Sequence, residues 1–145
     1  MQKDSYWVKY LLKKVRISSV NGVAQYYIMN QHPAFDHQRI SSLTELFGDS
    51  DSVRDLYIEF LDSCPERLAV IKQGIIDHRA DLIEFAAHAI HGTSANIGVL
   101  NIEETSAAIE SVAHQHQFAL VGAYVSELEE QIDGLREHID LRAVI

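Results

Sequence analysis

This chain has little of what builds a disulfide-stapled or many-turned protein. Its single cysteine, Cys64, cannot form an internal disulfide, which favours a reducing, intracellular compartment. Two prolines and seven glycines leave few positions for the tight turns of a β protein. No apolar run approaches the roughly 20 residues of a membrane helix, and the N-terminus lacks the features of a signal peptide. We therefore expect a cytoplasmic protein without stable membrane insertion.

Basic residues are also scarce. Twelve Lys and Arg stand against 21 Asp and Glu, which gives a formal net charge of −9 over 145 residues. The charge is uneven, because residues 1–16 carry +4 and the remainder carries −13. Nucleic-acid binding needs basic surface to neutralise phosphates, so this acidic body argues against it.

The first 33 residues are predicted to be an N-terminal extension or linker, partly helical. Trp7, Leu11 and Val15 share one face of a helix whose other face carries lysines, and Asn21-Gly22 ends it. Two interpretations stay open. In the first, the segment has a structural role only, as a helix packed on the main domain or as a linker from a larger protein. In the second, it is a short basic amphipathic helix that touches an anionic membrane.

What the chain has in abundance is apolar residues, 47% by count, which recur every three or four positions. This pattern predicts an all-α domain over 34–145: an antiparallel four-helix bundle at about 49–141, preceded by a short additional helix. The short helix is expected near Ala34–Phe47, ended by Gly48. The bundle helices are expected from caps at Asp49–Ser52 to about Ile75, with a kink or break at Pro65, then over about Arg79–Gly98, Asn101–His116 with Asn101 as N-cap, and Leu120–Ile139.

The segment from Phe85 to Gly98 is the most informative. At about 100° per residue, we expect one apolar face toward the core, formed by Leu82, Ala86, Ile90, Thr93, Ile97 and Leu100. His88 lies on the other side, toward solvent, with Gly92 one turn further on. Glycine in a helix interior costs about 1 kcal/mol relative to alanine, so Gly92 needs a reason. Clear space beside an imidazole would let another protein's active site approach, which predicts a docking nucleophile.

Histidine suits that role, because its unperturbed pKa of about 6.5 leaves a neutral, nucleophilic ring near neutral pH. Phosphoryl transfer depends mainly on in-line positioning and charge stabilisation, so a carrier needs little machinery of its own. The sequence has no Gly-rich phosphate loop, no Ser–His–Asp pattern and no nucleotide-binding motif. We expect a protein that is not an enzyme, without a kinase activity or an ATP site of its own.

A family resemblance is carried by the run Ala87-His88-Ala89-Ile90-His91-Gly92-Thr93-Ser94 and by Gly98 after it. This run is similar to the signature of histidine-containing phosphotransfer (HPt) domains, and the resemblance extends over about residues 34–141. It implies that His88 is the phosphorylated histidine of a multistep, two-component phosphorelay. The implied donor is the receiver domain of a hybrid sensor kinase, and the implied acceptor is the receiver domain of a response regulator. We expect a monomer that needs no cofactor.

Three positions depart from the family pattern, of which Ile90, in place of the usual leucine, is a conservative change. The family usually has lysine three residues after the histidine, where this chain has His91, and many members have glutamine 22 residues after it, where this chain has Glu110. His91 can donate a hydrogen bond to a phosphoryl group, and Glu110 can accept one from a ring N–H, so both are candidate phosphoryl-stabilising or orienting residues. The departures leave an alternative: a degenerate HPt-like interaction module that binds receiver domains without efficient transfer.

The docking surface is expected on the face around His88, with apolar neighbours from Phe35–Phe47 or the next helix. Its predicted members are Glu84, Gly92, Ser94, Ala95 and Gly98. His88 and His91 are three residues apart and offer two potential metal ligands, but the Glu-x-x-His pattern of di-metal bundles is absent from the sequence. We therefore expect no metal, and a metal- or haem-binding bundle is a third alternative.

Overall fold

The structure is a computed structural model that describes the backbone of residues 33–144 and the side chains of residues 33–140. The predicted extension at 1–33 lies, apart from Pro33, outside the described residues. Five helices follow: α3 (His37–Phe47), α4 (Ser50–Ile76), α5 (Ala80–Asn96), α6 (Leu100–His114) and α7 (Phe118–Val144). Among these, no helix combines the length and apolar character that crossing a membrane requires.

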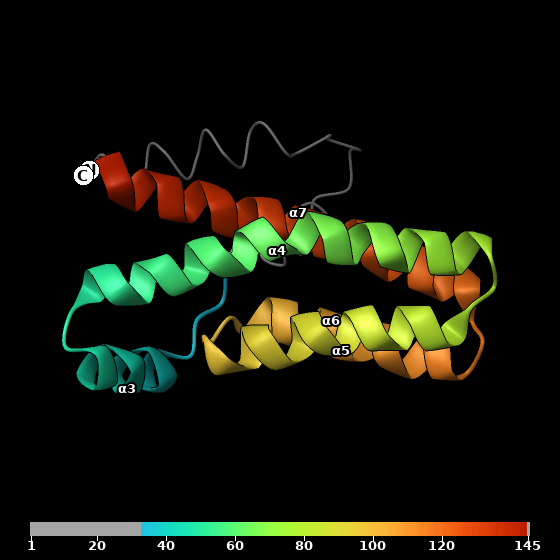
Figure 1. Ribbon diagram of the computed structural model, residues 1–145, viewed down its shortest axis with the longest axis horizontal. Coiled ribbons are helices and arrows are strands. Elements are labelled where there is room, and N and C mark those ends of the chain that lie inside the picture. The colour runs from blue at the N-terminus through green and yellow to red at the C-terminus, as the bar shows by residue number, and fades with distance from the viewer. Residues whose placement is uncertain (1–32, 145) are drawn as a thin grey trace, which may run out of the picture. The chain divides into compact units, whose positions relative to one another are not determined.

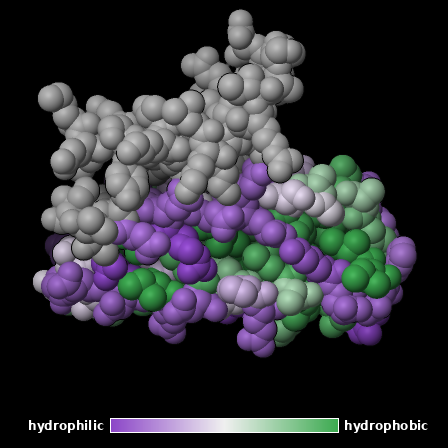
Figure 2. Space-filling view, turned by 90° about the horizontal axis from the view of Figure 1, so that it is seen from above, coloured by the Kyte–Doolittle hydropathy of each residue, from purple (hydrophilic) through white to green (hydrophobic). Residues whose placement is uncertain are grey.

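Helices α4 to α7 form an antiparallel four-helix bundle, as the sequence predicts (Figure 1). Each helix packs against the next, and α7 also packs against α4, which closes the bundle. The short α3 packs against α4. Apolar side chains of the four long helices make one core. In the coloured part of Figure 2, hydrophilic and hydrophobic residues lie in adjoining patches.

Local signals set the boundary between α3 and α4. Gly48 ends α3 in the left-handed conformation, with φ of 82°, and its N–H donates to the Thr44 carbonyl. The Asp49 carboxylate caps α4 by accepting from the Ser52 N–H at 2.6 Å, and this bond lowers the pKa of Asp49. Both predictions are confirmed.

Of the kink or break expected at Pro65, the break is wrong, because α4 runs through this residue without interruption, whereas the kink stays a prediction. Proline has no N–H, so the carbonyl of Leu61, one turn before it, loses its helical partner. Arg136 of α7 replaces that partner, since its Nη2 donates to the Leu61 oxygen at 3.2 Å. The missing hydrogen bond is thus supplied by another helix.

The predicted cap of α6 is also wrong. The helix begins at Leu100, and its N-cap residue, Val99, makes no side-chain capping bond. Val99 instead forms an antiparallel β-bridge with Phe35, in which the Leu100 N–H donates to the Ala34 carbonyl at 2.7 Å. The first N–H of α6 therefore has a hydrogen-bond partner in the chain segment before α3. Asn101 lies inside the helix, where its side chain accepts from the Ala34 N–H at 3.4 Å.

The buried face of α5 is rotated relative to the predicted stripe. Its fully or nearly fully buried residues are Ile83, Ala86, Ala87, Ile90 and Ser94. Leu82 and Thr93 are only half-buried, and Leu100 is 43% exposed. The rotation follows from packing, because α5 lies against both α4 and α6 and buries an arc that faces both neighbours.

Candidate functional site

His88 lies midway along α5 and faces away from the core. Its side chain is 76% exposed, whereas Ala87 before it and Ile90 after it are fully buried. The sequence prediction of a solvent-facing histidine is confirmed in this respect. The ring is nevertheless held on one side, by a group from the neighbouring helix.

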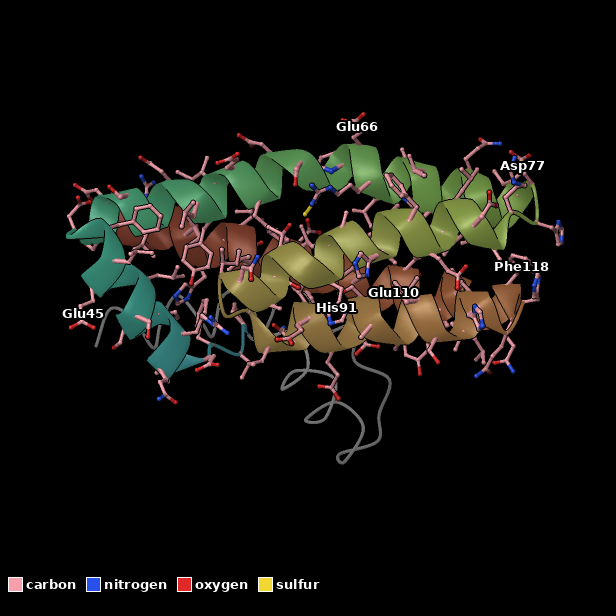
Figure 3. All side chains as sticks on the ribbon, turned by 60° about the horizontal axis from the view of Figure 1, so that its bottom comes forward. Glu45, Glu66, Asp77, His91, Glu110 and Phe118 are labelled. Atoms are coloured by element: carbon pink, nitrogen blue, oxygen red, sulfur yellow. The ribbon has the colours of Figure 1, made fainter. Side chains whose placement is uncertain are left out.

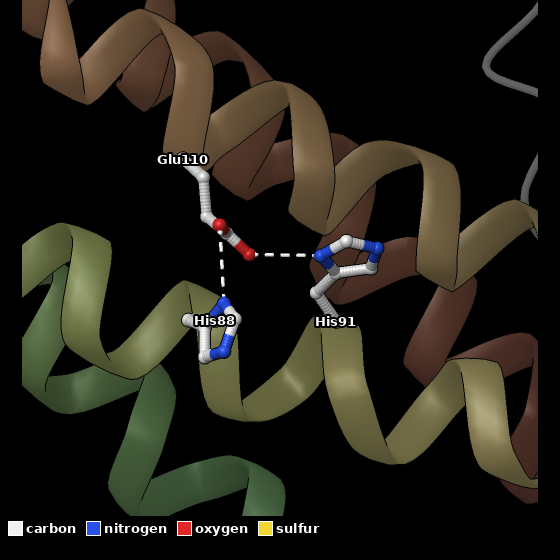
Figure 4. Close-up of side chains that lie close together, drawn as sticks. All are labelled: His88, His91 and Glu110. Carbon is white, nitrogen blue, oxygen red and sulfur yellow. Dashed lines mark hydrogen bonds and ion pairs between the residues drawn. The ribbon is translucent and has the colours of Figure 1, made fainter.

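That group is Glu110 of α6, whose carboxylate lies between two imidazoles (Figure 4). His88 Nδ1 is 3.3 Å from one carboxylate oxygen, and His91 Nδ1 is 2.9 Å from the other. An ionised carboxylate has no proton to donate, so each Nδ1 carries a hydrogen and donates it. A neutral His88 in this tautomer has its free lone pair on Nε2.

The three side chains are buried to different extents. Glu110 is 26% exposed and His91 is 33% exposed, so both line the seam between α5 and α6 (Figure 3). The two rings stand nearly perpendicular, with centroids 6.3 Å apart. His91 and Glu110, two of the three positions that depart from the HPt pattern, are thus in direct contact with each other, and Glu110 also contacts the exposed ring of His88.

The two glycines of the motif serve different purposes. Gly92 is exposed, and a Cβ built on it meets nothing within 4 Å, so packing within this domain does not require a glycine there. Gly98 has φ of 72°, and a Cβ on it would lie 3.2 Å from both the Asp36 oxygen and Arg39 Cβ. Gly98 is required by the turn and by its contact with α3, whereas Gly92 keeps space open outside the domain.

Two members of the predicted docking surface are wrong. Ser94 is completely buried, because it lies eleven residues, three helical turns, after the buried Ile83, and its hydroxyl donates to the His91 carbonyl at 3.0 Å. Gly98 is also buried, in the turn before α6. Gly92 is exposed, and Ala95 is half-buried near it along the helix. Glu84 is half-buried and contacts His114 Nδ1 at 2.8 Å.

Sequence reasoning missed two residues near His88. Phe85, one turn before it, is a large apolar side chain that is 78% exposed beside the histidine. Its place outside the apolar stripe was a signal available in the sequence. Arg67 of α4 is the second, because its guanidinium donates to the Ala89 carbonyl at 3.4 Å. No local pattern indicates that contact between helices. In the segment expected to supply apolar neighbours, Leu46 is 77% exposed.

The arrangement can also hold a metal ion. One nitrogen from His88, one from His91 and one Glu110 oxygen all lie within 4.8 Å of one another, and within residues 33–140 this is the only such group of three. The sequence pattern offers no carboxylate partner for the two histidines, because Glu110 comes from the next helix.

Comparisons with known proteins agree with this architecture. The Hpt domain family matches residues 55–140 of the chain. The crystal structure of histidine-containing phosphotransfer protein B (HptB) from Pseudomonas aeruginosa PAO1 superimposes with a TM-score of 0.69 at 21% sequence identity. The match covers 76% of this chain and 94% of that one, and it bears on the fold. No curated protein matches the sequence.

Proposed function

This chain belongs to the Hpt domain family, and on that premise we propose that it is a phosphocarrier in a multistep phosphorelay, with His88 as the phosphorylated residue. The donor is an aspartyl phosphate on the receiver domain of a hybrid sensor kinase. The acceptor is the aspartate of a response regulator. The chain contributes the histidine and its surroundings, and the receiver domains contribute the rest of the catalytic machinery.

The observation that carries this proposal is a combination that, among the described residues, only His88 has: an exposed ring whose Nδ1 contacts Glu110 at 3.3 Å, a carboxylate shared with His91, and open space at Gly92 one turn further on. With Nδ1 donating to Glu110, the Nε2 lone pair attacks phosphorus. The N–P bond forms as the bond from phosphorus to the aspartate oxygen breaks, and the aspartate leaves as a carboxylate. The reverse steps deliver the phosphoryl group to the second receiver.

Glu110 stabilises the product of this step. Phosphorylated at Nε2 and still protonated at Nδ1, the ring of His88 carries a positive charge. The Glu110 carboxylate lies directly against that charge, much as a buried aspartate supports the histidine of a catalytic triad. His91 acts through Glu110, because its hydrogen bond at 2.9 Å holds the second carboxylate oxygen. We treat both as positioning residues.

We further propose that the carrier is a cytoplasmic monomer. Cys64 is fully buried, and its thiol donates to the Phe60 carbonyl at 3.2 Å. Burial raises the pKa of this thiol to about 12, which keeps it neutral and unreactive. The one cysteine is thus unavailable for a disulfide between two folded chains.

The first test is transfer from a panel of phosphorylated receiver domains to the native chain and to the His88→Gln variant. We expect acid-labile label on the native protein and none on the variant. His114→Gln is the matched control, since His114 also contacts a glutamate across α5 and α6 and is 82% exposed. Label that survives in His88→Gln would overturn the assignment, as would no label from any donor on a protein shown to be folded by circular dichroism.

The second candidate function is an HPt-like module that binds receivers without efficient transfer. The favouring observation is that His91 and Glu110 both contact the site at positions where the family has other residues. Under this alternative, the double substitution His91→Lys with Glu110→Gln raises the transfer rate severalfold, because it restores the family pattern. An unchanged or lower rate supports the carrier.

A further inference from the structure

We propose that His88, His91 and Glu110 form a binding site for a divalent transition-metal ion of the Zn²⁺ type. Two imidazole nitrogens and one carboxylate oxygen are a donor set that such ions bind well. These donors come from adjacent helices, so the fold rather than a local motif brings them together. The metal site itself does not depend on the proposed phosphotransfer function.

The distances fit an ion after a small adjustment. Donor atoms around a tetrahedral Zn²⁺ lie about 3.3 Å apart, given bonds of about 2.0–2.2 Å. One carboxylate oxygen of Glu110 lies 2.9 Å from His91 Nδ1, and the other lies 3.3 Å from His88 Nδ1. The three donors lie within 4.8 Å of one another, so a side-chain movement of at most about 1.5 Å brings them to tetrahedral spacing. The His88 side chain, at 76% exposed, can make that movement.

The surroundings suit an ion with an open coordination position. Glu110 and His91 are two-thirds or more covered, which preorganises two ligands on the seam between the helices. Gly92 leaves the space outside open, so water can complete the coordination. The two Nδ1 hydrogens now point at one carboxylate, and a cation placed between the same atoms would replace them.

Such an ion would compete with phosphorylation, a consequence that does rest on the proposed function. Neutral imidazole has a single free lone pair. If the metal takes it at Nδ1 of His88, the ring proton moves to Nε2, and Nε2 can no longer attack phosphorus. The metal-bound and phosphorylated states of His88 then exclude each other, so the ion would act as an inhibitor of transfer.

Calorimetric titration of the untagged chain with ZnCl2 in a non-chelating buffer tests the site. We expect one Zn²⁺ per chain, with affinity at least tenfold lower in both His91→Gln and Glu110→Gln. His114→Gln should bind as the native chain does, because its partner Glu84 offers only a two-donor contact at 2.8 Å on the same helices. No saturable binding overturns the proposal, as does a loss in His114→Gln equal to that in His91→Gln.

A spectroscopic signature checks the ligands without relying on the variants. Long-range proton–nitrogen spectra of the native chain should show the Nδ1 resonances of His88 and His91 moving on addition of ZnCl2, with those of His114 unmoved. Movement of all histidines together would indicate adventitious surface binding and overturn the site.

The effect on transfer is measured separately, as the ratio of rates with and without ZnCl2. We expect a fall of at least tenfold for the native chain and a much smaller change in the residual transfer of His91→Gln, which keeps His88. Zinc binding without any phosphoryl transfer would reject the proposed function and leave the site standing. Transfer without zinc binding would do the opposite.

Discussion

Two histidine–glutamate contacts join α5 to α6 one helical turn apart, with opposite polarity. In the first, Glu84 of α5 meets His114 of α6 at 2.8 Å, and in the second, His88 of α5 meets Glu110 of α6 at 3.3 Å. The histidines are similarly exposed, at 82% and 76%. An exposed imidazole held by a carboxylate is therefore present twice, and by itself it does not mark a site.

The difference lies in what surrounds each ring. Glu110 is shared with a second histidine, His91, and Gly92 leaves open space one turn beyond His88. His114 is the last residue of α6, and its partner Glu84 bonds to no second histidine among the contacts of the described chain. His88 is therefore distinguished from His114 by two features: the second histidine that bonds its glutamate, and the open space beside its ring.

Among changes that leave His88 in place, the largest effect should come from filling that space. Gly92→Leu places a side chain where a receiver domain must approach, so we expect transfer to fall at least tenfold, or about 1.4 kcal/mol in the barrier. Gly122→Leu on α7 is the matched control, because a Cβ there also meets nothing within 4 Å. Initial rates from one phosphorylated receiver measure both. Equal effects of the two substitutions would remove the role assigned to Gly92.

A smaller effect on the transfer rate should follow removal of the Glu110 carboxylate, which contacts the His88 ring. Glu110→Ala removes the acceptor of His88 Nδ1 and the charge beside the phosphorylated ring, so we expect a three- to tenfold slower transfer, or about 0.7–1.4 kcal/mol. Glu84→Ala makes the same change in the other contact, at the edge of the predicted docking surface, and should slow transfer less than Glu110→Ala does. The comparison breaks down if Glu84→Ala slows transfer as much as Glu110→Ala.

The smallest effect concerns stability. Gly92→Ala and Gly122→Ala both replace a helix-interior glycine without a steric clash, so each should raise the free energy of unfolding by about 0.5–1 kcal/mol. Urea denaturation measures the gain. A loss of stability in Gly92→Ala alone would mean that the domain itself requires this glycine, contrary to a role in docking.

How far the sequence predicts the molecule depends on the range of the interaction. Gly48 and Asp49 were correctly assigned because each bonds within four residues of itself. In α4, the Leu61 carbonyl finds its partner in Arg136, 75 residues later in the chain, and no local pattern reveals such a partner.

In the candidate site, too, the features set by local geometry are predicted and those set by contacts between helices are not. Periodicity places His88 on an outward face, because that depends only on helical geometry. It misplaces Ser94, since the centre of the buried face is set by where α4 and α6 lie against α5. That Glu110 bonds both histidines at once depends on the register between α5 and α6, which only the folded chain defines.

The β-bridge between Phe35 and Val99 has a consequence for where the folded unit begins. It fastens the chain entering α3 to the turn between α5 and α6, through the Asp36 N–H to the Gly98 carbonyl at 2.8 Å and the Leu100 N–H to Ala34. The contact closes a loop that holds three helices, and closing a loop of that length carries an entropic cost. A shortened chain that starts at α3 itself would leave the Gly98 carbonyl and the Leu100 N–H without these partners, so we expect a fragment that keeps both bonds to start at or before Ala34.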